Sequence, residues 1–523
     1  MIEIDPTRFR TRPFAHQVVG TRALVENPYF ALFDEMRLGK SKQLIDAACI
    51  LSEQDDLGLV LVVAPAGVRQ VWLDVERDIG EIRKHAWVPS KVMEYHARGL
   101  RTVWCNPAAR LRWWVTNYEF IRAEDHDAGG RWRPGVRLRP LMAAVQKFKQ
   151  EQGSRVLLVL DESAFIKSPP HRAQQSRACH ALGVLADRRV IFNGTPVTRS
   201  PLDLWSQMRF LSHRILPFRN WTAFKDRYAC LIREYEHETI TGYQNLDELS
   251  ALVAPYCLQR KLADCFDLPA DLPPIYCEVP LSEKAWGIYK TVRDEMLAWL
   301  DTVQPTVVAT TAAVRMLRLA QICGGFLGGL DSMTDAEPAV LTGGDHVRAS
   351  VEVDHQKQDR VLEIIDELKM VNRSVVVWCR FRSERERLAA ACERRALEVY
   401  EIYGSQPLPD RARSVERFAR ARAADGFAVL LAQPAAGGFG LDLSAISDVL
   451  HYSRDFNALT FWQSSARVRH GLKSVPIGST YLLATGPRGQ QTVDHVIDRA
   501  LRQREEVARW TAARWRHEIV GEE

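Results

Sequence analysis

The stretch "GLVLVVAPAG" (residues 58–67) is continuously apolar over residues 59–64 and then ends abruptly at a proline. A parallel sheet covered on both faces requires such strands, because neither side of the strand meets water. Five other runs share the pattern: "RVLLVLDES" (155–163), "RRVIFNGTP" (188–196), "SVVVWCRF" (374–381), "FAVLLAQP" (427–434) and "SDVLHYSRD" (447–455).

These runs fall into two clusters, residues 30–200 and 372–490, with amphipathic segments such as "SKQLIDAACILSEQ" (41–54) between the strands. The sequence therefore predicts an α/β protein with two doubly wound parallel-sheet domains. Ligands of such domains bind beyond the carboxyl ends of the strands, so the residues that follow each apolar run are the candidate site residues.

The part of the chain between the clusters, residues 201–330, lacks the strand pattern and is predicted to be helical, for example over "PLDLWSQMRFLSHRIL" (201–216). The proline-bearing "DLPADLPPIYCEV" (267–279) interrupts it and is the candidate linker. The last segment, residues 491–523, is predicted to form a charged amphipathic helix.

Composition narrows the class of protein. The 523 residues carry 70 Lys and Arg against 65 Asp and Glu, a formal net charge of +5, so any affinity for phosphate polymers must come from local patches. The ten cysteines form no Cys-x-x-Cys pair, which favours reduced thiols and argues against a zinc site.

The first 14 residues have no apolar signal core, and no apolar run reaches the roughly 18 residues of a membrane span. We expect an intracellular protein with no membrane association.

A candidate phosphate site lies in "DEMRLGKS" (34–41), which supplies Gly39, Lys40 and Ser41 at the start of a helical run. A P-loop needs glycine where the backbone wraps phosphates, lysine for their charge and a hydroxyl for Mg²⁺. Asp34 stands where the general pattern has its first glycine, and Gly-Lys-Ser also occurs at ordinary helix starts. On this stretch alone, both interpretations stay open.

Two carboxylates strengthen the nucleotide interpretation. The strand "LLVLDES" (157–163) delivers Asp161 and Glu162, of which one can hold Mg²⁺ while the other polarises an attacking water. The alternative is a pair of solvated acids at a strand end. Further along, "FWQSSARVRHG" (461–471) carries Gln463, Arg467 and Arg469, and arginine stabilises charge on a transferring phosphoryl group. Taken alone, these arginines also fit a solvated helix face.

In this order, the pieces resemble superfamily 2 helicases, and more narrowly the Swi/Snf-type DNA-translocase family. The resemblance extends over about residues 10–510. It rests on "RPFAHQVVG" (12–20, the adenine-reading motif), "DEMRLGKS", "VVAPAGVRQVWLDVERD" (62–78, motif Ia), "VTNYE" (115–119), "DESAFIKS" (161–168), "NGTP" (193–196, motif III), "LQRKLADCFDLPADLPP" (258–274), "LRLAQICGG" (317–325), "VVVWCRF" (375–381, motif IV), "AGGFGLDL" (436–443, motif V) and "WQSSARVRHG" (462–471, motif VI).

The resemblance implies two RecA-like domains with helical insertions between them. The boundaries that we predict are 1–210 for the ATP-binding domain 1, 211–275 for a helical insertion and linker, 276–371 for a helical insertion leading into domain 2, 372–490 for the RecA-like domain 2 and 491–523 for the C-terminal helix.

The same resemblance implies ATP and Mg²⁺ as cofactors, bound between the two domains. Lys40, Glu162, Arg467 and Arg469 are the implied catalytic residues, and Ser41 and Asp161 the implied metal ligands. Implied contacts to ATP are Gln17, Gly39, Lys40, Ser41 and Gly440, and Thr195 and Gln463 are implied to couple the sites. The implied nucleic-acid contacts are Arg69, Thr116, Asn117, Thr195, Arg380, Gly404 and Gly437, mostly to phosphates.

The segment "GGRWRPGVRLRP" (129–140) adds Arg131, Arg133, Arg137 and Arg139 around Trp132. Its arginines favour a basic finger that contacts DNA, and a solvated loop is the alternative.

Four positions depart from the family pattern. Ala164 replaces a usual histidine, Arg37 a usual glycine and Gln433 a usual Ser or Thr, and in motif VI Arg469 precedes the expected position by one residue. These departures leave open how the two halves communicate and which arginine acts on the phosphate.

The function that the resemblance implies is ATP-driven translocation on double-stranded DNA, which remodels DNA or protein–DNA complexes. Two alternatives remain: a strand-separating or annealing helicase for branched DNA, and an ATPase-defective DNA-binding scaffold. Compact members of the family suggest a cytoplasmic protein of a prokaryote or of a phage-infected cell.

Overall fold

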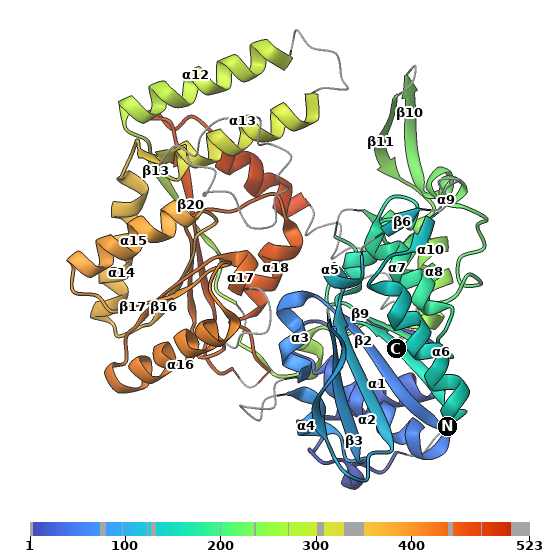
Figure 1. Cartoon of the computed structure of the whole chain (residues 1–523). Coiled ribbons are helices and arrows are strands. Elements are labelled where there is room, and N and C mark those ends of the chain that lie inside the picture. The colour runs from blue at the N-terminus through green and yellow to red at the C-terminus, as the bar shows by residue number, and fades with distance from the viewer. Residues whose placement is uncertain are drawn as a thin grey trace. The chain divides into compact units, whose positions relative to one another are not determined.

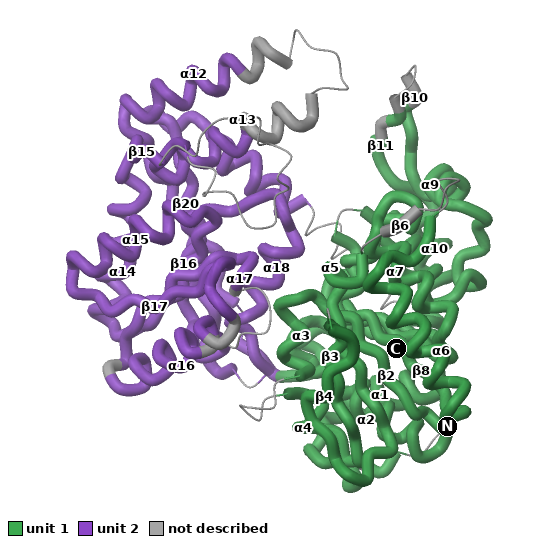
Figure 2. Tube along the Cα trace, in the orientation of Figure 1, with its two compact units in different colours: residues 1–266, 504–523 green, residues 267–503 purple. Residues whose placement is uncertain are grey.

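The computed structural model describes residues 4–73, 80–96, 98–122, 124–126, 132–198, 200–234, 237–269, 271–300, 308–328, 350–437, 443–471 and 473–503. The chain divides into two compact units with a boundary between Phe266 and Asp267 (Figure 2). We describe the part of unit 1 up to Phe266 and unit 2, residues 267–503, separately.

Unit 1 is built on an eight-stranded sheet with the order β12-β1-β9-β8-β2-β5-β3-β4 (Figure 1). The strands are β1 (Tyr29–Leu32), β2 (Leu57–Ala64), β3 (Ser90–His96), β4 (Gly99–Cys105), β5 (Leu111–Asn117), β8 (Arg155–Leu160), β9 (Arg188–Phe192) and β12 (Cys257–Leu258). All neighbours are parallel except β3 and β4, which form an antiparallel hairpin at one edge. The predicted parallel sheet is confirmed, and the hairpin is an addition to it.

Strand β2 shows why the apolar runs are continuous. All eight of its residues are buried, and alternate side chains enter different clusters: Leu59, Leu61 and Val63 lie in one, Val60 and Val62 in the other. Because successive side chains of a strand point to opposite faces, the sheet has an apolar core on each side. The helices that flank the strands are α1 (Ala15–Glu26), α2 (Lys40–Gln54), α3 (Ala66–Leu73), α4 (Glu81–His85), α5 (Tyr118–Ile121), α6 (Leu138–Gln152), α7 (Gln174–Gly183) and α8 (Leu204–Leu211).

The segment after α8 contains more strand than predicted. Helices α9 (Trp221–Tyr228), α10 (Leu246–Val253) and α11 (Leu262–Cys265) agree with the expectation, but β10 (Ala229–Glu234) and β11 (His237–Tyr243) form an antiparallel hairpin that projects beyond α9 (Figure 1). Its run "ETITGY" is rich in threonine, isoleucine and tyrosine, which favour strands, and the local pairing supplies a partner for each strand.

Unit 2 contains a six-stranded, wholly parallel sheet with the order β13-β20-β19-β16-β18-β17 (Figure 1). The strands are β13 (Ile275–Pro280), β16 (Val375–Trp378), β17 (Val399–Ile402), β18 (Val429–Ala432), β19 (Asp448–His451) and β20 (Gly478–Thr485). Three of them coincide with predicted runs. Strand β13 lies in the proposed linker, so that prediction was wrong for residues 275–279.

The helices of unit 2 are α12 (Glu283–Leu300), α13 (Val308–Cys323), α14 (Gln356–Met370), α15 (Arg382–Arg394), α16 (Leu408–Asp425), α17 (Pro434–Gly437) and α18 (Ala458–Ala466). A small antiparallel pair, β14 (Phe326–Leu327) and β15 (Val351–Glu352), follows α13. Residues 493–503 of the predicted C-terminal helix are helical, and residues 504–523 lie outside the described residues.

Both units are therefore α/β domains of the predicted RecA-like kind. All ten cysteines lie in the described ranges and are free thiols. Within those ranges, no helix combines the length and the apolar character that crossing a membrane requires, and no group of three His, Cys, Asp or Glu residues is placed to hold a metal ion.

Candidate functional site

The candidate phosphate loop connects β1 to α2 and contains two left-handed residues. Gly39, the residue before α2, has φ 72°, and Arg37 has φ 74°. A Cβ at position 39 would collide with the side-chain amide of Gln17. The backbone conformation therefore favours glycine at position 39, where a Cβ would also displace the Gln17 amide, and Arg37 adopts a conformation that favours glycine too.

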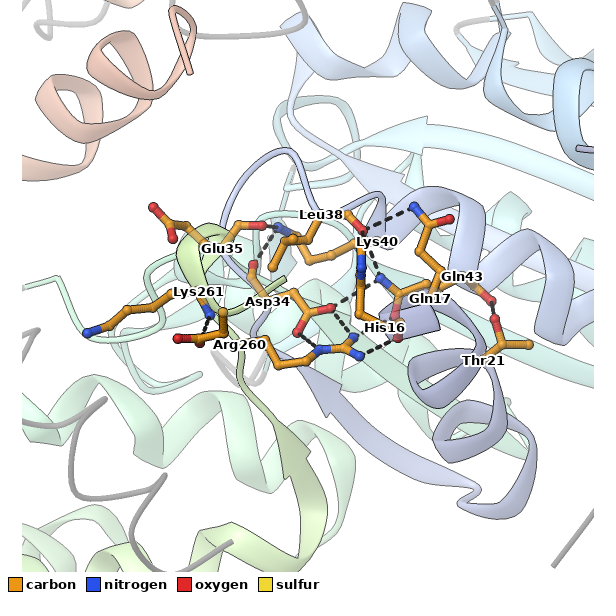
Figure 3. A network of polar contacts seen from close by, with 11 residues as sticks. His16, Gln17, Thr21, Asp34, Glu35, Leu38, Lys40, Gln43, Arg260 and Lys261 are labelled. Carbon is orange, nitrogen blue, oxygen red and sulfur yellow. Dashed lines mark hydrogen bonds and ion pairs between the residues drawn. The ribbon is translucent and has the colours of Figure 1, made fainter. Parts of the chain in front are cut away.

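Lys40 begins α2 and points back into this loop. Its Nζ donates to the carbonyl of Asp34 at 2.7 Å and to that of Glu35 at 3.3 Å (Figure 3). The ammonium is thus held above a turn at a helix N-terminus, where the helix dipole and backbone N–H groups favour an anion. These residues suit the phosphates of a nucleotide, and Ser41, the next residue, supplies a hydroxyl.

The contacts of Asp34 explain why an aspartate stands where the general P-loop pattern has its first glycine. It is fully buried and ion-paired with Arg260, whose Nε donates to Oδ1 at 2.9 Å. The side chain of Gln43 on α2 donates to Asp34 Oδ2 at 3.1 Å and accepts from Arg260 at 2.9 Å (Figure 3). Asp34 therefore anchors the loop to the helix and to the segment after β12. The sequence identified that segment as basic but did not reveal that Arg260 contacts the loop.

Gln17 lies against the same loop from α1. Its Nε2 donates to the Leu38 carbonyl at 3.4 Å, and its Oε1 accepts from the backbone N–H of Phe14 at 3.1 Å. His16 also contacts the Leu38 carbonyl, at 3.2 Å, and burial lowers the pKa of His16. The predicted adenine-reading residue is thus next to Gly39.

Asp161 and Glu162 follow β8 and are 8% and 9% exposed, so they are not solvated surface acids. Asp161 Oδ2 accepts from the indole N–H of Trp72 at 2.9 Å, and its backbone carbonyl accepts from the hydroxyl of Tyr118 at 2.9 Å. Glu162 has φ 56°, a left-handed conformation that is uncommon for a residue with a side chain and is found at functional sites. The pair has the chemistry of a Mg²⁺ ligand and a water-orienting base.

The topology brings these residues to one edge of the sheet. Strands β1, β9 and β8 are parallel neighbours, so the loop with Lys40, motif III with Thr195 and the Asp161–Glu162 pair all leave from the same carboxyl edge. Asn193 accepts from the Thr195 backbone N–H at 3.0 Å. The metal-ligand and catalytic candidates of unit 1 are thus neighbours, although they lie far apart in the sequence.

A buried glutamine connects motif III with the acidic pair. Gln207 of α8 is fully buried, accepts from the hydroxyl of Ser163 at 2.6 Å and donates to the carbonyl of Pro196 at 2.8 Å. The sequence did not identify this residue. Ala164, at the position where the family usually has histidine, is buried.

The nucleic-acid candidates of unit 1 converge around α3. Arg69 Nη1 lies 3.3 Å from both Asn117 Oδ1 and Glu94 Oε1, and Arg101 also pairs with Glu94, at 2.6 Å. Glu94 was missed because a lone glutamate on a strand carries no signal. Thr116 is fully buried and its hydroxyl donates to the Tyr95 carbonyl at 3.4 Å, so a phosphate contact by this side chain would require the packing to open.

Strand β7 (Trp132–Pro134) of the basic insertion pairs antiparallel with β6 (Glu124–His126), which precedes the insertion. Arg133 on β7 is exposed, and the Arg137 guanidinium lies 4.7 Å from the centre of the Phe120 ring. Arg131 lies outside the described residues.

In unit 2, Gln433 joins the predicted nucleic-acid residues. It follows β18, accepts from the backbone N–H of Gly404 at 3.0 Å and donates to the carbonyl of Arg380 at 3.5 Å. Arg380 and Gly404 follow β16 and β17, the neighbours of β18 in the sheet. The larger amide at this position therefore binds both adjacent strand ends, which a Ser or Thr is too short to do. Gly437 ends α17, and Gly440 lies outside the described residues.

The motif VI residues lie on and just after α18. Gln463 is fully buried, and no group in the described ranges hydrogen-bonds to either atom of its amide. Arg467 caps the end of α18, and Arg469 is exposed and ion-paired with Asp271. The ion pair of Arg469 is on the surface, where solvent weakens it, and the backbone N–H of Arg467 donates to the Ser464 carbonyl at the end of α18.

Comparisons with known proteins give a consistent family. The model of the SNF2-related domain matches residues 26–373, and that of the helicase conserved C-terminal domain matches residues 356–471. Similar curated proteins include a chromatin-remodeling ATPase INO80 of Eremothecium gossypii, 25% identical over 52% of this chain and 18% of the relative. The putative ATP-dependent helicase/translocase YwqA of Bacillus subtilis is 27% identical over 59% and 31%, and the Zorya protein ZorD of Escherichia coli O139:H28 is 25% identical over 82% and 37%.

The chain spans less than two fifths of the length of these curated relatives. Among solved structures, the Sulfolobus solfataricus SWI2/SNF2 ATPase core in complex with dsDNA matches 99% of this chain and 97% of its own, with 20% identity and a TM-score of 0.39. The SNF2-related model covers well over half of the chain. The chain belongs to the SNF2-related family, the Swi/Snf-type ATPases of superfamily 2.

Proposed function

We propose that this protein is a DNA-dependent ATPase that hydrolyses ATP with Mg²⁺ and uses the energy to translocate on double-stranded DNA. One observation carries the proposal: Lys40 at the start of α2 and the buried Asp161–Glu162 pair leave from the same edge of a parallel sheet. A cation above a helix N-terminus beside two carboxylates suits a metal-bound triphosphate and a water.

In this proposal Lys40 binds the phosphates, Gln17, Gly39 and Gly440 contact the nucleotide, and Ser41 and Asp161 hold the metal. Glu162 orients the attacking water. Bound Mg²⁺ supplies positive charge that offsets the charge of the phosphates. From unit 2, Arg467 and Arg469 contribute guanidinium groups to the same nucleotide, and Gln463 and Thr195 couple nucleotide binding to movement. The amide of Gln463 has no hydrogen-bond partner among the described residues, which supports this role, because buried amides ordinarily have such partners.

The proposed DNA contacts lie on both units and are mostly to phosphates. On unit 1 they are Arg69, Asn117, Thr116 and Thr195 with the basic hairpin, and on unit 2 they are Arg380, Gly404 and Gly437. The similarity to proteins named as a chromatin-remodeling ATPase and as a putative helicase/translocase supports a DNA-remodelling role. The proposal places the protein in the cytoplasm of a prokaryotic or phage-infected cell, where ATP and DNA are both present.

Replacement of two residues tests the ATPase site. Lys40→Ala and Glu162→Gln are each expected to lower ATP turnover with duplex DNA at least about 100-fold, because each removes a group that acts on the reacting phosphate or water. Lys147→Ala and Glu151→Gln, on the exposed face of α6, are the matched controls. Turnover that survives both site replacements would contradict the proposed pocket.

Translocation is tested separately from hydrolysis. A translocase on duplex DNA displaces the third strand of a triplex and leaves a forked duplex paired. Unwinding of the fork without triplex displacement would instead support the strand-separating alternative, and ATP turnover that no nucleic acid stimulates would contradict DNA dependence.

A further inference from the structure

Trp72 connects the nucleic-acid helix to the acidic pair. It lies on α3, one turn after Arg69, and is 1% exposed. Its indole N–H donates to Asp161 Oδ2 at 2.9 Å, while Arg69 on the same helix contacts Asn117 and Glu94. One short helix therefore carries, one turn apart, a candidate phosphate contact and a hydrogen bond to the candidate metal ligand.

A second connection reaches the same residue. Tyr118, directly after Asn117, is fully buried, and its hydroxyl donates to the backbone carbonyl of Asp161 at 2.9 Å. Its ring stacks on Phe165 in the turn after Glu162, with centroids 5.1 Å apart and planes within 9°.

Both segments to which we assign DNA contacts thus hydrogen-bond to Asp161. Trp72 donates to its carboxylate, and Tyr118 donates to its backbone carbonyl. We propose that Trp72 and Tyr118 are positioning residues that transmit DNA contact at Arg69 and Asn117 to the orientation of Asp161, and so set how well the site holds its divalent cation. This inference rests on the proposed ATPase function and adds the route by which DNA stimulates it.

Physical chemistry supports such a route. A hydrogen bond to a carboxylate contributes more than one between neutral groups, and here the carboxylate is nearly buried, so solvent does not replace a lost donor. Partners that orient a metal ligand tune metal affinity although they do not touch the metal. A small displacement of α3 when DNA binds changes the indole-to-carboxylate geometry directly, because Trp72 and Arg69 share one helix.

The competing explanation is that Trp72 and Tyr118 only fill the core, since both belong to apolar clusters. Two conservative replacements separate the explanations: Trp72→Phe removes the indole N–H and keeps an aromatic ring, and Tyr118→Phe removes one oxygen. Matched controls are Trp113→Phe, whose buried indole donates to Ser90, and Tyr228→Phe, whose buried hydroxyl contacts Glu248.

The experiment measures Mn²⁺ binding to the full chain in the presence of ADP by electron paramagnetic resonance, together with the ratio of ATP turnover with and without duplex DNA. We expect Trp72→Phe and Tyr118→Phe to raise the Mn²⁺ dissociation constant about tenfold and to lower the stimulation ratio, while both controls stay within about twofold of the native protein. Thermal unfolding checks that all four variants are folded. If Trp72→Phe unfolds, Tyr118→Phe carries the test, because it leaves the ring in place.

Comparison of single and double variants adds a measurement whose result would not change if Trp72 only filled the core. Arg69→Ala alone is expected to lower the stimulation ratio, and in the Trp72→Phe background it is expected to lower it no further, because both changes interrupt one route. Additive effects would overturn the inference.

Other outcomes are also distinguishable. Unchanged Mn²⁺ affinity and stimulation in both phenylalanine variants would overturn the positioning role and leave the ATPase proposal standing. Absence of DNA-stimulated turnover in the native protein would overturn both.

Discussion

Arg37 shows how one residue departs from its family and what that departure does to the backbone. Its φ of 74° lies in the left-handed region, where a side chain is strained and glycine is not. Arg37 lies in the loop between β1 and α2, next to the residues that we propose to bind the nucleotide.

We therefore predict that Arg37→Gly raises the free energy of unfolding by about 0.5 to 1 kcal/mol, which is the strain relieved minus the extra freedom of glycine in the unfolded chain. Urea unfolding, followed by tryptophan fluorescence, measures the change. The control is Lys147→Gly in the middle of α6, where glycine is expected to lower stability by about 1 kcal/mol. A loss of stability in Arg37→Gly would mean that interactions of the arginine side chain outweigh the strain.

The sequence predicted the positions of the residues whose chemistry is distinctive, but it did not predict which residues contact them. Lys40 and the Asp161–Glu162 pair stand at a predicted helix start and a predicted strand end, so position in the sequence already fixed their surroundings. Arg260 contacts Asp34 from 226 residues away, and Gln207 bridges Ser163 and Pro196 from a helix face. Such contacts depend on tertiary packing that no local pattern reports.

At the scale of elements, the N-terminus of α15 contains a buried titrating group. Glu384 accepts from the Phe381 backbone N–H at 3.1 Å and from the Ser453 hydroxyl, both at Oε2. Burial raises the pKa of the Glu384 carboxyl from 4.5 to about 7, although those hydrogen bonds and Lys357 act in the opposite direction. The folded protein therefore binds this proton more tightly than the unfolded chain does.

The sign of the pH dependence follows from that difference. The contribution of Glu384 is fully present below about pH 4.5 and is lost as the pH rises to about 7, so it lowers the free energy of unfolding by roughly 1 to 3 kcal/mol across that window. We predict that Glu384→Gln removes this component when unfolding is measured at pH 5 and at pH 8. Glu386→Gln, on the exposed side of α15, is the control. Identical pH dependence in the native protein and in Glu384→Gln would contradict the assignment.

The hairpin of β6 and β7 gives a prediction for DNA binding. Arg133→Glu on β7 together with Arg139→Glu at the start of α6 is expected to weaken duplex binding and to reduce the slope of log affinity against log salt by about one for each phosphate that the protein no longer neutralises. Arg488→Glu, on an exposed turn of unit 2, is the control. Fluorescence anisotropy over a salt titration provides the measurement. An unchanged slope would mean that these two arginines face solvent and do not contact DNA.

Elements were predictable where the local pattern sufficed. Buried parallel strands such as β2 and β18 have side chains buried on both faces, so their continuous apolar runs identified them. Strand β13 was taken for a linker because it follows a proline-rich run and its exposed residues give no such pattern; its partner β20 lies about 200 residues later in the chain. The β3–β4 and β10–β11 hairpins were missed because their residues are mixed in polarity.

At the scale of the whole molecule, the residues proposed to act on ATP are divided between the two units. Unit 1 contains the phosphate loop and the acidic pair, and unit 2 contains the motif VI arginines. The order of motifs along the chain predicted this division, and the two α/β units agree with it. Which arginine acts on the phosphate was not predictable from spacing, because Arg469 is displaced by one residue from the family pattern. Arg469 is ion-paired with Asp271, and we propose Arg467 for that role and test it directly.

The most direct test of this division is single-turnover ATP hydrolysis by Arg467→Ala with saturating duplex DNA, measured alongside binding of a fluorescent ATP analogue. We predict that hydrolysis falls by about 10³-fold or more while binding stays within about threefold, because the nucleotide is held mainly by unit 1 and the arginine acts on developing charge. Arg488→Ala should match the native protein in both measurements. Hydrolysis by Arg467→Ala at the native rate would contradict the proposed role of Arg467 in ATP hydrolysis.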